Sequence, residues 1–215
     1  GQNRPSFTFG AAAATITIAG ANGGWVNCRF VANFLDVASA FTLGAAKGFT
    51  LQGNEFTETS SILNFLSIVT TGATDNDADD LVVRDNLWIG LNTTPLAFIS
   101  ILAAESGLLV EDNSCFLDAT SGGEFITLAA KIISAARIRR NNHIVVGATG
   151  TTTGIFLTGS GTTSKGVIHD NFCSSLDTTT ELMFTAGTGL DYFRNEYTGV
   201  ADKSGYIVPV IDSSA

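Results

Sequence analysis

Charged residues are scarce in this sequence. They make up 14% of its 215 residues, against about 25% in average globular proteins. Acidic residues outnumber basic ones by 20 to 11, which gives a formal net charge of −9. Proteins that bind nucleic acid or anionic membranes carry basic surfaces. We therefore expect neither nucleic acid nor a membrane as a partner.

Cysteine and long apolar runs are also scarce. Three cysteines, an odd and small number, do not indicate a disulfide framework. No apolar run reaches the roughly 18 residues of a transmembrane helix, and no signal peptide is visible. The first residue is Gly1 rather than Met, and the chain begins in what reads as the middle of a repeat. We expect a processed or shortened piece of a longer protein.

The chain does contain a repeat that is centred on asparagine. Around Asn113 the sequence reads Val110-Glu111-Asp112-Asn113-Ser114-Cys115. An apolar residue or tyrosine stands three positions before each repeated Asn, and a mostly bulky or buried residue type stands two positions after it. The repeated residues are Asn54, Asn86, Asn113, Asn141, Asn171 and Asn195, at steps of 32, 27, 28, 30 and 24 residues. A period of about 20–50 residues is typical of a solenoid, a propeller or another array.

The composition of each repeat favours an all-β solenoid. Short alternating runs of Val, Ile, Leu, Phe and Thr predict strands, proline is nearly absent, and no segment has a capped helical period. A leucine-rich repeat has a tighter period, and a propeller needs four strands per unit. We expect one parallel β-helix domain over residues 1–215, of about six to eight rungs with two strong strands and a weaker third each. Residues 1–24 are expected to form a truncated first rung, and residues 199–215 a C-terminal cap or tail.

The repeated asparagines are expected to stack in one corner column. Successive rungs of a parallel β-helix lie about 4.8 Å apart, and a side-chain amide both donates and accepts hydrogen bonds. Asparagine also tolerates the left-handed conformation that a sharp corner needs. Cys28 takes the place of Asn in an earlier rung, because Phe30 aligns with Phe56.

The rungs, of the form Leu-x-Val-x-Asp-Asn-x-Phe, resemble those of right-handed parallel β-helix proteins of the pectin-lyase-like superfamily. Residues 3–10, 30–34, 68–79 and 199–206 further resemble structural proteins of tailed bacteriophages that carry β-helix repeats. The resemblance covers essentially the whole chain. It implies a non-enzymatic component of the virion, such as a decoration, fibre or spike protein, with other virion proteins as partners. That group has no established active-site motif, so no catalytic or cofactor-binding residue is expected.

One loop has the composition of a metal site. Asp75, Asp77, Asp79 and Asp80 form an Asp-x-Asp-x-Asp-Asp motif in the longest polar loop. Oxygen ligands at alternate positions can wrap Ca²⁺, but the glycine and the closing glutamate of an EF-hand are missing. We favour a solvated acidic loop and keep Ca²⁺ as the alternative.

Two carboxylates keep an enzymatic alternative open. Asp85 and Asp112 stand one position before the Asn of successive rungs, so they lie about one rung apart. Paired carboxylates can share a proton and perform acid–base chemistry, as in a polysaccharide-cleaving or carbohydrate-binding tailspike. Arginines nearby favour charge alternation instead, with Arg84 beside Glu111, Glu111 beside Arg139 and Arg140 beside Asp170. Each carboxyl pKa should then be lowered.

A third possibility for the function is an autotransporter-like surface passenger.

The two histidines and the cysteines do not predict a further catalytic site or a disulfide. His143 falls in a core column, where a hydrogen-bonded buried histidine is expected. His169 precedes Asp170, but no Ser or Cys nucleophile accompanies them. Cys115 and Cys173 lie two rungs apart in the same column, about 9–10 Å, too far for a disulfide.

Apolar residues on an outer column predict self-association. Val82, Leu109 and Val167 stand four positions before an Asn, on the face opposite the core column. Monomers rarely expose a contiguous apolar strip. We expect these residues to be buried in a closed homo-oligomer, and the resemblance to phage β-helix proteins implies a trimer.

Overall fold

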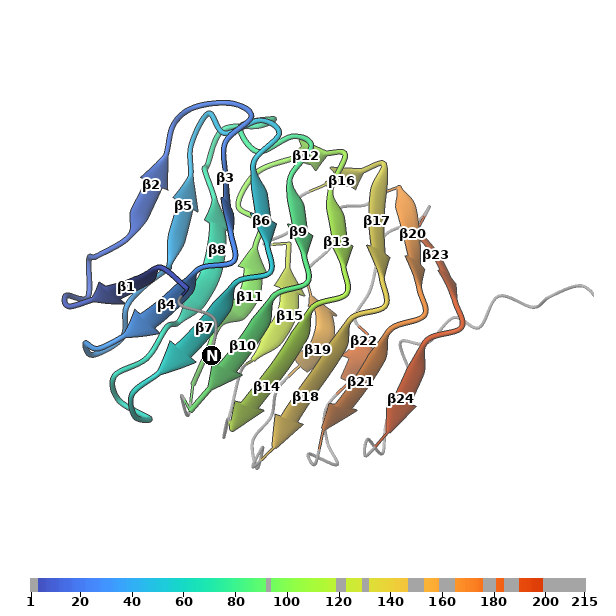
Figure 1. Ribbon diagram of the computed structural model, residues 1–215. Coiled ribbons are helices and arrows are strands. Elements are labelled where there is room, and N and C mark those ends of the chain that lie inside the picture. The colour runs from blue at the N-terminus through green and yellow to red at the C-terminus, as the bar shows by residue number, and fades with distance from the viewer. Residues whose placement is uncertain are drawn as a thin grey trace, which may run out of the picture.

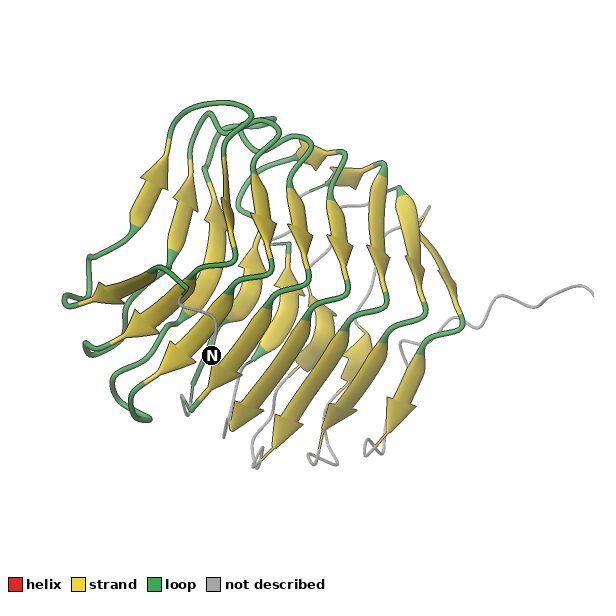
Figure 2. Cartoon of the chain, viewed as in Figure 1, coloured by secondary structure: helices red, strands yellow, loops and turns green. Residues whose placement is uncertain are grey.

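The structure, a computed structural model, describes residues 4–91, 94–118, 123–128, 132–146, 153–158, 165–175, 181–183 and 190–198. These residues contain strands and turns and no helix, as Figure 2 shows. Accordingly, none of them belongs to a helix that could cross a membrane. The described chain is an all-β solenoid of parallel strands, as the repeat predicts.

Three long parallel sheets form the sides of the solenoid, and a short pair of strands lies at one corner. Sheet A contains β1 (Ser6–Phe9), β4 (Arg29–Ala32), β7 (Glu55–Glu58), β10 (Leu87–Gly90), β14 (Ser114–Asp118), β18 (Asn142–Val146), β21 (Phe172–Ser175) and β24 (Glu196–Thr198). Sheet B contains β2 (Ile16–Ile18), β5 (Phe41–Leu43), β8 (Ser67–Thr71), β11 (Ala97–Ser100), β15 (Glu124–Thr127), β19 (Thr153–Thr158) and β22 (Glu181–Met183). Sheet C contains β3 (Gly24–Val26), β6 (Thr50–Gln52), β9 (Val82–Arg84), β13 (Leu109–Glu111), β17 (Ala136–Arg139), β20 (Gly166–His169) and β23 (Leu190–Phe193). The short pair consists of β12 (Glu105–Ser106) and β16 (Ile133–Ser134).

Each turn of the chain passes through sheets A, B and C in that order, and every strand pairs with its equivalent in the next turn. In Figure 1 the strands of sheet A lie below those of sheet C on the near side, and those of sheet B lie behind. Each rung therefore contributes one strand to each of three sheets, so the third strand, which was expected to be weaker, also forms a full sheet. Residues 1–24, expected to be a truncated rung, contain β1, β2 and the start of β3, one strand in each sheet. The coil makes about five turns between Asn54 and Asn195, and β1–β6 extend the same sheets on the N-terminal side.

The core is a continuous apolar column inside the three sheets. On sheet A the residue two positions after the Asn points inward, and Phe56, Trp88, Cys115, His143 and Cys173 pair in register. All five are fully buried. Phenyl rings continue the column around the corner, where Phe98 stacks on Phe125 with ring centroids 5.4 Å apart. Burial of such side chains stabilises the solenoid by roughly 2 kcal/mol each.

Candidate functional site

The six predicted asparagines form one ladder at the corner between sheets C and A. Each side-chain amide donates from Nδ2 to Oδ1 of the next Asn, from Asn54 to Asn86 and onward to Asn195. These five bonds measure 2.9–3.1 Å. Asn54, Asn86, Asn113, Asn141 and Asn171 are at most 2% exposed. The predicted corner column is confirmed.

The ladder also satisfies the backbone of the corner. Oδ1 of each Asn accepts the backbone N–H at the equivalent position of the preceding turn, for example Asn86 N–H to Asn113 Oδ1 at 3.1 Å. Nδ2 also donates to a carbonyl in the preceding rung, as Asn113 does to Val83 at 2.9 Å. Each amide therefore bonds the backbone of the preceding turn and the side-chain amide of the next turn.

The left-handed conformation belongs to the residue before the Asn, and the expectation that Asn itself adopts it is wrong. The residues in this position have φ between 50° and 66°. They are Asn27, Gly53, Asp85, Asp112, Arg140, Asp170 and Arg194. The ladder Asn residues are not among the residues with positive φ, and each lies immediately before a strand of sheet A with its side chain in the buried ladder.

The ladder ends at Cys28 and Pro5. Cys28 occupies the predicted position, and its N–H donates to Asn54 Oδ1 at 2.9 Å. Cysteine cannot replace the amide as an acceptor for the preceding rung. The equivalent residue there is Pro5, since Ser6 pairs with Arg29, and proline has no N–H to satisfy. This first turn therefore needs no further amide.

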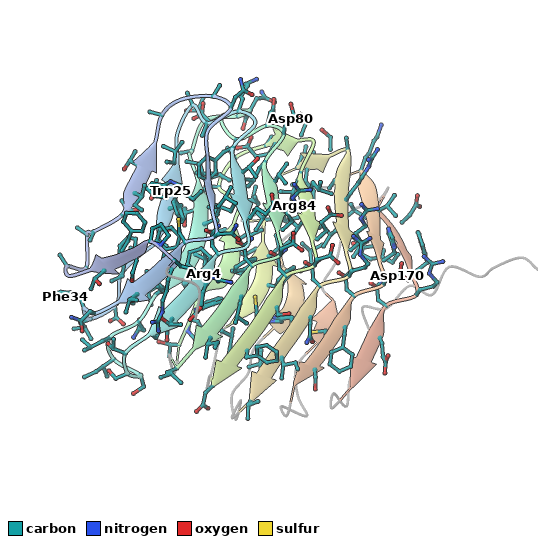
Figure 3. All side chains as sticks on the ribbon, in the orientation of Figure 1. Arg4, Trp25, Phe34, Asp80, Arg84 and Asp170 are labelled. Carbon is teal, nitrogen blue, oxygen red and sulfur yellow. The ribbon has the colours of Figure 1, made fainter. Side chains whose placement is uncertain are left out.

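Charged side chains line the outside of the same corner. Arg140 donates to Asp112 with two bonds of 2.8 and 2.7 Å, and Arg194 donates to Asp170 in the same way at 2.7 and 2.8 Å. Arg139 pairs with Glu111 at 2.7 Å, as expected. Arg140 lies beside Asp170 in the column but pairs with Asp112 of the preceding rung, because its side chain leans back along the axis. Figure 3 shows Arg84 and Asp170 along this near face.

These ion pairs hold the carboxyl groups in the ionised form. The hydrogen bonds from Arg140 lower the pKa of Asp112. Those from Arg194 and His169 lower the pKa of Asp170 to about 2. A shared proton between Asp85 and Asp112 requires a raised pKa in one partner. The lowered pKa of Asp112 agrees with charge alternation.

His143 is a buried structural histidine. It is fully buried between Cys115 and Cys173 in register, and its Nε2 bonds the Gly123 carbonyl at 2.7 Å. Burial lowers its pKa to about 4, so at neutral pH Nε2–H donates to that carbonyl. The three cysteines are buried and free, as the register requires.

His169 lies at the outer corner with Asp170. Its Nδ1 contacts Asp170 Oδ2 at 2.6 Å, and its ring stacks on Phe193 with centroids 4.8 Å apart. The guanidinium of Arg194 lies over the Phe193 ring, 5.1 Å from the ring centroid. No hydroxyl or thiol bonds the imidazole in the described residues.

The acidic loop between β8 and β9 packs on the next rung. Asp75 Oδ1 accepts the Ala104 N–H at 2.9 Å, and Asp79 Oδ1 accepts the Ser106 N–H at 2.8 Å. Asp79 also pairs with Lys47 at 3.1 Å. Burial works to raise the pKa of Asp79, but the bonds from Ser106 and Lys47 outweigh it and lower the pKa. Across the described segments, no three His, Cys, Asp or Glu side chains are grouped so as to hold a metal ion.

The predicted oligomer residues share one outer column of sheet C, but Arg137 interrupts it. Val82 pairs with Leu109, Leu109 with Arg137, and Arg137 with Val167. The three apolar residues are half-buried. Larger exposed apolar side chains lie on the outer face of sheet A, where Ile89 is 41% and Phe116 is 40% exposed and the two pair in register. The unbroken apolar runs at 87–89 and 115–117, which place apolar residues on both faces of a strand, were the signal for this second strip.

No protein-family model, curated protein or solved structure matches the chain. The assignment to the β-solenoid architecture rests on the strand pairing and the Asn ladder.

Proposed function

We propose that this protein is a non-enzymatic structural component of a bacteriophage virion, a rigid β-solenoid rod. The observation that carries the proposal is the buried Asn ladder, which ties each turn to the next through main chain and side chain. Such a ladder and a continuous core resist bending and local unfolding, because every turn is packed against its neighbours. The resemblance of the rungs to phage β-helix proteins is the reason for placing this rod in a phage virion.

The chemistry of the outer corner supports a mechanical role. Carboxylates that serve as general acids have a raised pKa, whereas Asp112 and Asp170 are paired with arginines that lower theirs. These pairs join successive rungs and so reinforce the rod. Exposed ion pairs of this kind add only modest stability.

The proposal includes a homotrimer with its contact on sheet C. Val82 and Leu109 form an adjacent apolar pair on that sheet. Three copies around a common axis would cover this pair, and other virion proteins would attach along the remaining faces. A closed ring of identical subunits avoids an open-ended fibre.

Isolation of intact virions tests the function. We expect the chain to co-purify with particles at a fixed copy number that is a multiple of three. Its absence from particles would contradict the proposal. A reducing-sugar assay on phage-host polysaccharides should show no cleavage, and Asp85→Asn with Asp112→Asn should leave the function of the protein in the particle unchanged. Cleavage that this double variant abolishes would establish the enzymatic alternative.

A further inference from the structure

The corner between sheets B and C is joined by carboxylates. Residues 75–80 lie against residues 104–106 of the next turn, beside the short strand β12 at the top of Figure 1. Two main-chain bonds cross this corner, from Asn76 to Ala104 and from Asp80 to Ser106, both 2.8 Å. Three more use the side chains of Asp75, Asp79 and Glu105 as acceptors. Figure 3 labels Asp80 at this corner.

Glu105 is the central and most buried of these acceptors. Its Oε2 accepts the Ala78 N–H at 3.0 Å, which points the side chain into the acidic loop. The residue is only 3% exposed, and its Oε1 is buried without a hydrogen-bond partner among the residues that the structure describes. A buried carboxylate oxygen without a partner is costly, whereas a protonated one carries no charge.

The groups that face Glu105 make its ionisation harder. Asp75, Asp77 and Asp79 of the loop all repel a charge on it. Lys47, from the preceding turn, pairs with the far side of Asp79. On the other side β16 contributes Ile133 and Ser134, which are uncharged, and residues 129–131 lie outside the described chain. Burial, followed by the three aspartates, raises the pKa of Glu105 to about 7.

We propose that Glu105 and the loop of residues 75–80 form a proton-operated latch between sheets B and C. With Glu105 protonated the corner is closed, and the Ala78 N–H is held by Oε2. Loss of the proton places a buried charge beside three aspartates, and the loop separates from residues 104–106 while the three sheets stay intact. The latch does not depend on the proposed function.

The direction of the pH effect follows from the two states. In the open corner Glu105 is solvated and ionises at its ordinary pKa, so opening releases a proton between pH 4.5 and about 7. Opening therefore becomes easier as pH rises through this window and is constant above it. The corner is tightest in acid, opposite to the usual behaviour of a paired carboxylate.

Hydrogen exchange read by mass spectrometry tests the latch on the whole chain, in EDTA, from pH 5 to 8.5. We expect protection of peptides covering 75–80 and 104–106 to fall by up to about tenfold per pH unit below pH 7, after correction for intrinsic exchange, and then to level off. Glu105→Gln, which mimics the protonated group, should abolish this dependence. Identical profiles for the wild type and Glu105→Gln would overturn the proposal.

Two further variants separate electrostatics from packing. Asp77→Asn removes one charge that repels Glu105, and the Asp77 carboxylate makes no hydrogen bond in the described structure. The pH above which the protection of the corner peptides stays constant should therefore be lower in this variant. Glu124→Gln is the matched control, because Glu124 is also a carboxyl with a pKa raised to about 7 by burial but belongs to β15. It should keep the wild-type profile at the corner. An unchanged profile in Asp77→Asn, or a flattened one in Glu124→Gln, would also exclude the latch.

Discussion

At the scale of single residues, the Asn ladder depends on a side chain that donates and accepts at once. Asn113 accepts from the backbone and side chain of Asn86 and donates to Val83 and Asn141. Aspartate lacks the donor and alanine lacks both groups. Loss of the Asn113 amide therefore leaves two backbone groups of the preceding turn unpaired, the Asn86 N–H and the Val83 carbonyl, and removes one bond from each neighbouring Asn side chain.

We expect Asn113→Ala to lower the free energy of unfolding by about 3–5 kcal/mol, since each buried polar group left without a partner costs about 1–3 kcal/mol. Asn142→Ala is the matched control, because Asn142 is half-buried and its Oδ1 has no partner within the described part of the chain. It should cost less than about 1 kcal/mol. Urea unfolding measures both. Equal losses would mean that the ladder adds nothing specific.

His143 should make the protein sensitive to acid. Its pKa is about 4 in the folded protein against 6.5 for a solvated histidine side chain, so between these values the unfolded chain binds a proton that the folded chain excludes. The stability that depends on neutral His143 is complete above pH 6.5 and falls by about 3 kcal/mol by pH 4.

His143→Gln isolates this effect, because glutamine can still donate to the Gly123 carbonyl but does not titrate. The difference in unfolding free energy between wild type and variant should shrink as pH falls from 6.5 to 4. Glu105 and Glu124 act in the opposite direction in both proteins and cancel in the difference. A difference that is independent of pH would contradict the buried neutral histidine.

At the scale of elements, close approach of neighbouring strands decides where glycine is required. Gly166 begins β20, and a Cβ there would lie 2.4 Å from the Ala136 carbonyl oxygen and 2.9 Å from the Ala136 Cβ. These atoms belong to β17, which the other strands hold in place.

Gly166→Ala should therefore push β20 away from β17 and cost about 1–3 kcal/mol. Gly10→Ala is the control, because a Cβ at Gly10 meets nothing within 4 Å. Thermal unfolding followed by circular dichroism compares them. A Gly166→Ala variant as stable as Gly10→Ala would indicate that the two strands lie further apart.

At the scale of the whole molecule, two outer faces carry apolar strips, and the proposed trimer uses only one. Val82→Asp with Leu109→Asp should dissociate the trimer, because buried charges without partners are costly. Ile89→Asp with Phe116→Asp, on sheet A, should leave it intact. Light scattering gives the mass of each form. A monomeric wild type at micromolar concentration would refute the oligomer, and the reverse pattern would move the contact to sheet A.

The sequence by itself determined the solenoid and its corner column. Asn recurs at a nearly regular step with an apolar residue three positions before it, and that pattern survives because each turn must present the same amide to its neighbours. The core columns followed from strand alternation for the same reason, including the position of His143 and of Cys28. Local patterns that repeat along a chain can be recognised from the sequence alone, before the fold is known.

Only the tertiary structure decided which groups meet across turns. Arg140 pairs with Asp112 rather than Asp170, because the lean of a long side chain along the axis is not encoded in its column. Glu105 reaches the loop of residues 75–80 although 27 residues separate it from Ala78. Arg137 interrupts the outer strip because the register of β13 and β17 aligns it with Leu109. Such contacts depend on the direction of each side chain and on the path of each loop. Because the rungs differ in length, the sequence does not predict either of them before the turns are stacked.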